Sequence, residues 1–66
     1  MREEHLFRAK APGMVAGFVA SQDGIVFFTA PVLKRRILGM KLDEAIARLE
    51  TEGWTVKSLG RRVVPR

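Results

Sequence analysis

The sequence predicts a small α+β protein with one antiparallel sheet, formed by a β-hairpin and a C-terminal strand, and one main helix packed on one face. Three observations lead to this class: two apolar stretches joined by an Asp-Gly turn, an amphipathic helical stretch, and a final stretch of strand-forming residues. The predicted order is β-β-(short α)-α-β. With 66 residues the chain is long enough for one domain, predicted over residues 14–60. We expect residues 1–13 to form a loosely ordered tail and residues 61–66 a basic C-terminal tail.

The first two predicted strands span residues 14–20 and 25–30. The Asp-Gly pair at 23–24 is a strong hairpin signal, because a type I′ turn requires positive φ at both of its central residues. Counting outward from this turn places Val19 opposite Phe28 on the neighbouring strand.

Neither of these strands alternates apolar and polar residues, so both faces of the hairpin are apolar. One helix covers one face, and the other needs either the N-terminal segment or another subunit. We expect a homodimer, because a chain this short buries only about 60% of its unfolded surface and has no cysteine for a disulfide. The predicted dimer or partner interface consists of Val15, Val19, Val26 and Phe28.

Pro31 ends the second strand and suits the first position of a short helix over Val32–Leu38, which Gly39 closes. Leu33 and Ile37 share one face of that helix at the i, i+4 spacing. The alternative for this segment is an irregular crossover.

The clearest element is a helix over residues 42–52, in which apolar residues recur at i, i+3, i+4 and i+7. This stripe consists of Leu42, Ala45, Ile46 and Leu49. Gly53 provides the left-handed residue after the helix, and Trp54 packs back on Leu49, as in a Schellman motif. We therefore assign Trp54 to the core. A third strand is predicted over residues 54–59.

The residue types give little support for catalysis, and we predict a non-enzymatic protein without cofactor, metal or small-molecule substrate. Ser21 and Ser58 lack a positioned base, because the single histidine, His5, lies in the predicted tail. The chain has no cysteine and no glycine-rich phosphate-binding motif. No apolar run approaches the roughly 20 residues of a membrane span, and no secretory signal is present. We expect a cytoplasmic protein that does not bind membranes.

Charge is the strongest functional signal. The net charge is +5, and from position 34 onward nine bases stand against four acids. A basic half-molecule attracts phosphate backbones or acidic protein surfaces. The predicted nucleic-acid-binding residues are Lys34, Arg35, Arg36, Lys41, Arg61 and Arg62.

Residues 37–59 resemble one half of a PASTA repeat. The shared residues are Gly39, Met40, Glu44, Ala45, Leu49, Gly53 and Val56. The resemblance covers about a third of the chain. Trp54 stands where the family has a small aliphatic residue, and the two strands that follow in the family are absent. It implies a capped helix leading into a strand, and we do not transfer the family's ligand binding.

The layout of residues 25–56 also resembles small uncharacterised proteins encoded by bacteriophages and prophages. The shared residues are Ala30, Pro31, Leu33, Arg36, Gly39, Gly53 and Trp54. This resemblance implies an accessory gene product that binds a partner, and it assigns no functional residue.

These observations lead to one main hypothesis and two alternatives. The main hypothesis is a binding protein that contacts nucleic-acid phosphates and reads little sequence. The first alternative is a phage-encoded inhibitor or adaptor that docks on a host complex through the apolar hairpin face, or through its basic face on an acidic host protein. The second is a structural subunit of a larger assembly.

Overall fold

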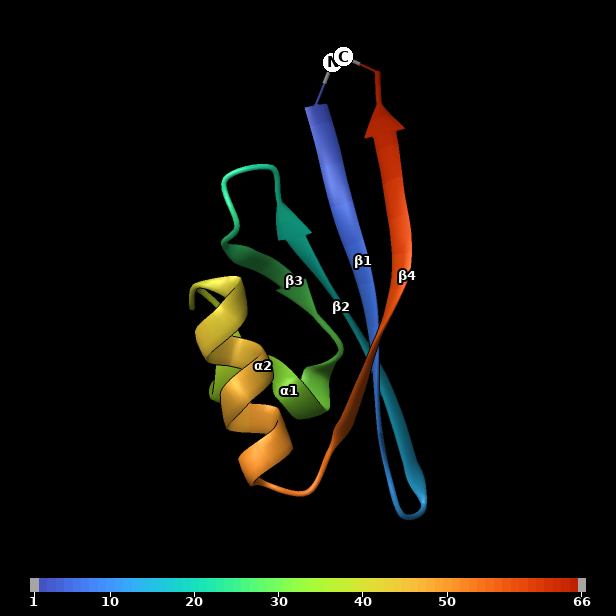
Figure 1. Ribbon diagram of the computed structural model, residues 1–66, viewed down its shortest axis with the longest axis vertical. Coiled ribbons are helices and arrows are strands. Elements are labelled where there is room, and N and C mark those ends of the chain that lie inside the picture. Colours follow the sequence, from blue (N-terminus) through green and yellow to red (C-terminus); the bar gives the residue numbers. More distant parts are fainter. Residues whose placement is uncertain (1, 66) are drawn as a thin grey trace.

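The computed structural model describes residues 2–65 and contains a four-stranded antiparallel sheet with two helices (Figure 1). This confirms the predicted α+β class. The elements are β1 (Arg2–Ala11), β2 (Met14–Ser21), β3 (Val26–Thr29), α1 (Pro31–Ile37), α2 (Leu42–Thr51) and β4 (Thr55–Val64). Their order in the sheet is β3-β2-β1-β4, so the chain has one strand more than predicted.

The additional strand is β1, and the prediction of a loosely ordered tail over residues 1–13 is wrong. β1 lies inside the sheet, between β2 and β4. Pro12 and Gly13 form the turn into β2, and Gly13 has a φ of 76°, which glycine adopts without strain. Proline followed by glycine is a turn signal that the sequence already contained.

β4 is longer than the predicted third strand and pairs with β1 along its length. The segment predicted as a basic tail, residues 61–66, belongs to this strand up to Val64. Arg66 lies outside the described residues. The pairing shifts by one residue at Leu59, which faces no partner on β1.

A β-bulge changes the hairpin register. Val19 lies opposite Phe28, as predicted, but Ala20 lies opposite Val26, so Phe27 is the extra residue. Val26 therefore turns into the core and is 0% exposed, whereas Phe27 and Phe28 are exposed. The prediction that Val26 belongs to an exposed interface is wrong for this reason.

The turn between β2 and β3 is not type I′. The N–H of Gly24 donates to the carbonyl of Ser21 at 2.9 Å, so Gln22 and Asp23 occupy the central positions. Gly24 has a φ of 84°, and within residues 2–65 only glycines have positive φ.

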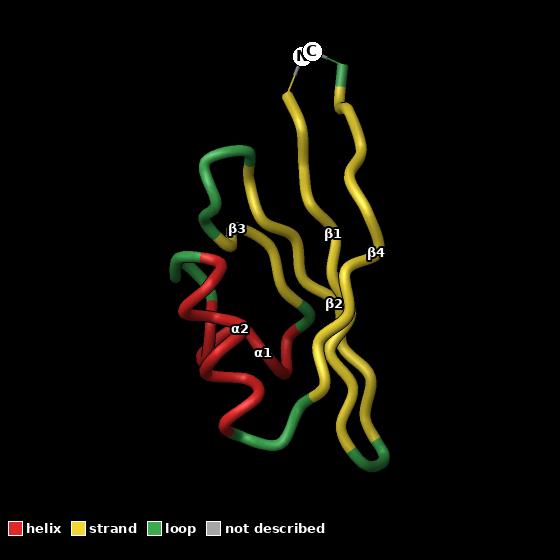
Figure 2. The backbone as a smooth tube through the Cα atoms, in the orientation of Figure 1, coloured by secondary structure: helices red, strands yellow, loops and turns green. Residues whose placement is uncertain are grey.

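Both helices pack on the same face of the sheet (Figures 1 and 2). Leu33 and Ile37 of α1 and Ala45 and Leu49 of α2 are fully buried, which confirms the predicted helices and their apolar stripes. The core also includes Phe7, Ala9, Ala16, Phe18, Ala20, Val26 and Trp54.

The end of α2 follows the predicted Schellman pattern. Gly53 has a φ of 96° and donates to the carbonyl of Glu50 at 3.1 Å. Trp54 donates to the carbonyl of Leu49 at 2.9 Å and is 7% exposed, which confirms its assignment to the core.

The sheet face opposite the helices is called the open face here. Because side chains alternate along a strand, the core residues of β1 and β2 define which neighbours point to the other side. Phe7 and Ala9 point to the helices, so Leu6, Arg8 and Lys10 belong to the open face.

Candidate nucleic-acid interface

The six residues predicted to contact phosphates do not form one surface. The triplet at 34–36 lies on α1, Lys41 precedes α2, and Arg61 and Arg62 lie on β4. In Figure 1, α1 lies beside the middle of the sheet, whereas the end of β4 extends beyond the helices.

Half of this predicted set is also neutralised by acids. The contacts are Arg36–Glu52 at 2.8 Å, Arg61–Glu3 at 3.3 Å and Arg62–Glu4 at 2.9 Å. The other three residues, Lys34, Arg35 and Lys41, make no ion pair with any described residue. An arginine that already pairs with a carboxylate has its charge partly compensated, which weakens its attraction for a phosphate.

Glu4 shows how firmly one end of the sheet is neutralised. Its carboxylate accepts a hydrogen bond from Arg62 Nε at 3.0 Å and forms ion pairs with Arg62 Nη2 at 2.9 Å and Arg2 Nε at 3.6 Å. The residue is only 4% exposed. A buried carboxylate requires such partners, so these arginines have a structural role.

A second group of bases lies further along the same two strands, on the open face. This basic cluster consists of Arg8, Lys10 and Lys57. Arg8 lies directly opposite Lys57, and Lys10 lies opposite Thr55 in the next row. All of these side chains are exposed, and they line a shallow hollow of about 260 Å³.

No described carboxylate forms an ion pair with the basic cluster. Like charges at directly opposite positions of an antiparallel pair destabilise the sheet. The pair Arg8–Lys57 is therefore placed unfavourably in the free protein, and Lys10 adds a third positive charge beside it.

A row of apolar side chains on the open face, exposed at Phe28 and Leu59 and buried at Val19, borders the basic cluster. This apolar row consists of Leu6, Val19, Phe28 and Leu59, which line a hollow of about 330 Å³. Leu6 lies opposite Val19, and Val19 opposite Phe28, across three strands. Phe28 is 59% exposed and Leu59 49% exposed. The open face thus combines apolar surface with uncompensated positive charge.

Sequence reasoning missed Arg8 and Lys10, although a signal was present. They alternate with Phe7, Ala9 and Ala11, which is the period of a half-buried strand. The following Pro-Gly turn supports the same interpretation.

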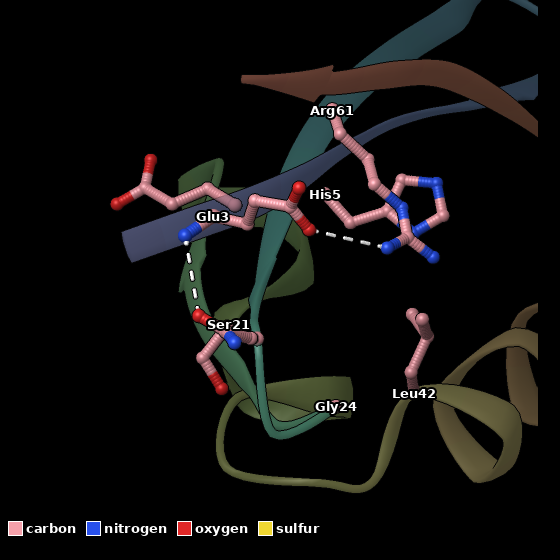
Figure 3. A pocket seen from close by; sticks show the side chains of 8 residues that line it. Glu3, His5, Ser21, Gly24, Leu42 and Arg61 are labelled. Atoms are coloured by element: carbon pink, nitrogen blue, oxygen red, sulfur yellow. Dashed lines mark hydrogen bonds and ion pairs between the residues drawn. The ribbon is translucent and has the colours of Figure 1, made fainter. Parts of the chain in front are cut away.

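A smaller polar hollow of about 110 Å³ lies where β1 and β4 approach the start of α2 (Figure 3). Glu3 and Arg61 form an ion pair across it, and His5 lies beside them. β1 also brings His5 Nε2 within 2.8 Å of Ser58 Oγ, a pair that we expected to be apart.

The His5–Ser58 contact has the first element of a nucleophilic site, a hydroxyl beside a base. Ser58 is exposed on the edge strand, and its Oγ also accepts from the N–H of Gly60 at 3.3 Å. Among residues 2–65 no further hydrogen bond orients the imidazole, which packs against the Phe7 ring at a tilt of 40° with ring centroids 4.1 Å apart. The contact joins β1 to β4.

Comparisons with protein-family models, curated proteins and solved structures gave no match. Within residues 2–65, neither helix has the length and apolar character needed to cross a bilayer. The same residues contain no group of three histidine, aspartate or glutamate side chains arranged to hold a metal. The function of the open face is therefore inferred from its geometry.

Proposed function

We propose that this protein binds nucleic acid and that the basic cluster on the open face contacts the phosphate backbone. One observation carries the proposal: Arg8 faces Lys57 directly, Lys10 lies in the next row, and no described acid pairs with them. A bound phosphate would remove the repulsion within this cluster. Its binding would therefore stabilise the protein as well as the complex.

The chemistry of the cluster suits phosphate in particular. Lysine, arginine and threonine side chains are common phosphate contacts, and Thr55 lies beside Lys10 in the same hollow. The net charge of +5 adds a long-range attraction that increases the association rate.

The three unpaired bases of the originally predicted set, Lys34, Arg35 and Lys41, form the competing assignment. A pair of matched triple variants separates the two. One replaces Arg8, Lys10 and Lys57 with glutamine, and the other replaces Lys34, Arg35 and Lys41 with glutamine. Each variant lowers the net charge of +5 by three units.

The test is fluorescence anisotropy with a labelled single-stranded oligonucleotide across a salt series. We expect log K against log salt to fall steeply for the wild type and for the variant lacking Lys34, Arg35 and Lys41. The open-face variant should lose affinity, and its slope should decrease by about 2, or roughly 0.7 for each phosphate contact removed. Retained binding by the open-face variant, together with loss in the other, would assign the contacts to the helix side instead.

A further inference from the structure

We infer that the nucleic acid is single-stranded and that its bases stack on the apolar row, with Phe28 as the principal stacking residue. This inference rests on the proposed function. It identifies the class of ligand and assigns a binding role to side chains that carry no charge.

The exposure of neighbouring phenylalanines is the first observation. Phe28 lies opposite Val19 on the open face and is 59% exposed, and the bulge turns Phe27 out of the core, where it is 46% exposed. A side chain this exposed gains little from burial, so packing within the described chain does not account for it. Phe28 lies opposite Val19 on the neighbouring strand, and both residues line the same hollow.

The second observation is the position of the Phe28 ring relative to the basic cluster. Phe28 lies two strands away from Leu6, roughly 10 Å across the sheet, and Arg8 lies roughly 7 Å from Leu6 along β1. The Cα atoms of Phe28 and Arg8 are therefore roughly 12 Å apart, a span that the long Arg8 side chain and a nucleotide can bridge together. A nucleotide can therefore place its base on the apolar row while its phosphate reaches the basic cluster. The register across β1, β2 and β3 fixes this arrangement on rigid strands.

Single-stranded nucleic acid fits this surface better than a duplex. Bases in a duplex are already stacked on one another, and their faces are inaccessible to a protein ring. Unpaired bases present their faces, and aromatic side chains beside a basic groove bind them with little sequence preference.

A second copy of this chain is the competing occupant of the apolar row. A symmetric dimer uses the same patch on both subunits, so it would bring two basic clusters to the border of one buried surface. Glu4 could not compensate them, because it already accepts from Arg62. The charge on this face therefore favours a polyanion over a second copy.

The experiment compares oligothymidine with an abasic oligonucleotide of equal length, which has the same phosphates and no bases. We expect oligothymidine to bind at least about fivefold more tightly, the low end for one stacked base. Phe28→Ala should remove this difference and leave affinity for the abasic strand unchanged. An oligouridine series distinguishes RNA from DNA as the preferred strand.

Equal affinity for oligothymidine and the abasic strand would overturn the stacking inference and leave the proposed function standing. Absence of binding to both would overturn both. Phe28→Trp provides a second readout that does not depend on truncating the ring. Its fluorescence should be quenched by oligothymidine, whereas Val32→Trp, on α1, should show no quenching.

Sedimentation equilibrium without nucleic acid tests whether a second copy of the chain occupies the apolar row. We expect a monomer at the protein concentrations used for binding. A dimer that Phe28→Asp dissociates, and that oligothymidine leaves intact, would overturn the inference.

Discussion

At one end of the paired strands β1 and β4, acids face bases, whereas at the other end bases face bases. Glu4 lies opposite Arg62, and its neighbour Glu3 pairs with Arg61. A few residues further along, Arg8 faces Lys57 with no acid to pair with either. Both ends belong to the same antiparallel pair of strands, on either side of the register shift at Leu59, and they differ in the charges that their side chains place opposite one another.

Arg62 and Arg8 have different roles, although the sequence alone does not distinguish them. Arg62 stabilises the sheet by neutralising a carboxylate that is only 4% exposed. Arg8 adds a repulsion to the free protein, and its charge is available to a ligand. To locate a phosphate-binding surface, the number of basic side chains without an acidic partner on that surface is therefore more informative than the number of basic residues in the chain.

The largest expected effect is on binding, through reversal of charge at the uncompensated end. Arg8→Glu should weaken oligonucleotide binding at least about tenfold, because it removes one phosphate contact and repels the strand, and it should lower the magnitude of the salt slope by roughly 0.7. Anisotropy titration measures both quantities. Glu50→Lys, which adds positive charge on the exposed side of α2, should not restore binding in the double variant. Restoration would indicate that only net charge matters.

The next largest effect is on stability, through loss of the Glu4 charge at the end of β1 and β4 where acids pair with bases. Glu4→Gln should lower the free energy of unfolding by about 1–2 kcal/mol, because Arg62 loses a charged hydrogen-bond acceptor while remaining partly hydrated. Urea unfolding measures the change. The matched control is Glu50→Gln, an exposed glutamate without an ion pair among residues 2–65, which should change stability by less than about 0.5 kcal/mol. Equal losses in both variants would contradict the structural role of Glu4.

A third, smaller effect concerns Arg36, a predicted phosphate contact that pairs with Glu52. Desolvation raises the pKa of Glu52, but hydrogen bonds from Arg48 and Arg36 outweigh it and lower the pKa below the ordinary value of 4.5. A lowered pKa in the folded state stabilises the protein above that value, and the stabilisation is lost as the pH falls through the folded pKa.

Glu52→Gln tests this pH dependence. Wild type should be more stable than the variant at neutral pH, and the two should converge as the pH falls below 4.5. Urea unfolding across a pH series provides the measurement. A difference that stays constant on acidification would show that the charge of Glu52 does not contribute.

The smallest effect is a gain in the stability of the free protein in the same Arg8→Glu variant that loses binding. Arg8→Glu places opposite charges across from each other with Lys57, so it should stabilise the free protein by about 0.2–1 kcal/mol at low salt. The gain should shrink as salt screens the pair. Thermal unfolding at two salt concentrations measures it, and a destabilised variant would show that Arg8 has a structural role of its own.

The helices and their caps could be predicted from the sequence because their signals are local. Leu33 and Ile37, and Ala45 and Leu49, lie at helical spacing and are all fully buried. β1 was missed because its first half mixes acids and bases, although its second half alternates as a strand does.

The remaining features depend on contacts between distant parts of the chain. The bulge at Phe27 forms where Val26 enters a core that the helices complete. Glu4 and Arg62 are 58 positions apart, so local pattern could not pair them. The phosphate-binding residues predicted from the sequence were misplaced for the same reason. Basic side chains that form ion pairs cannot be distinguished from those that do not until the strand pairing is known.

The most direct test of nucleic-acid binding at the open face is an NMR titration with oligothymidine, in which arginine Nε–H and backbone amide shifts are followed residue by residue. We expect the Nε–H of Arg8 and the amides of Lys10 and Lys57 to shift together, while the Nε–H of Arg62 stays in place. Shifts confined to Arg35 and its neighbours on α1, with Arg8 unaffected, would contradict it.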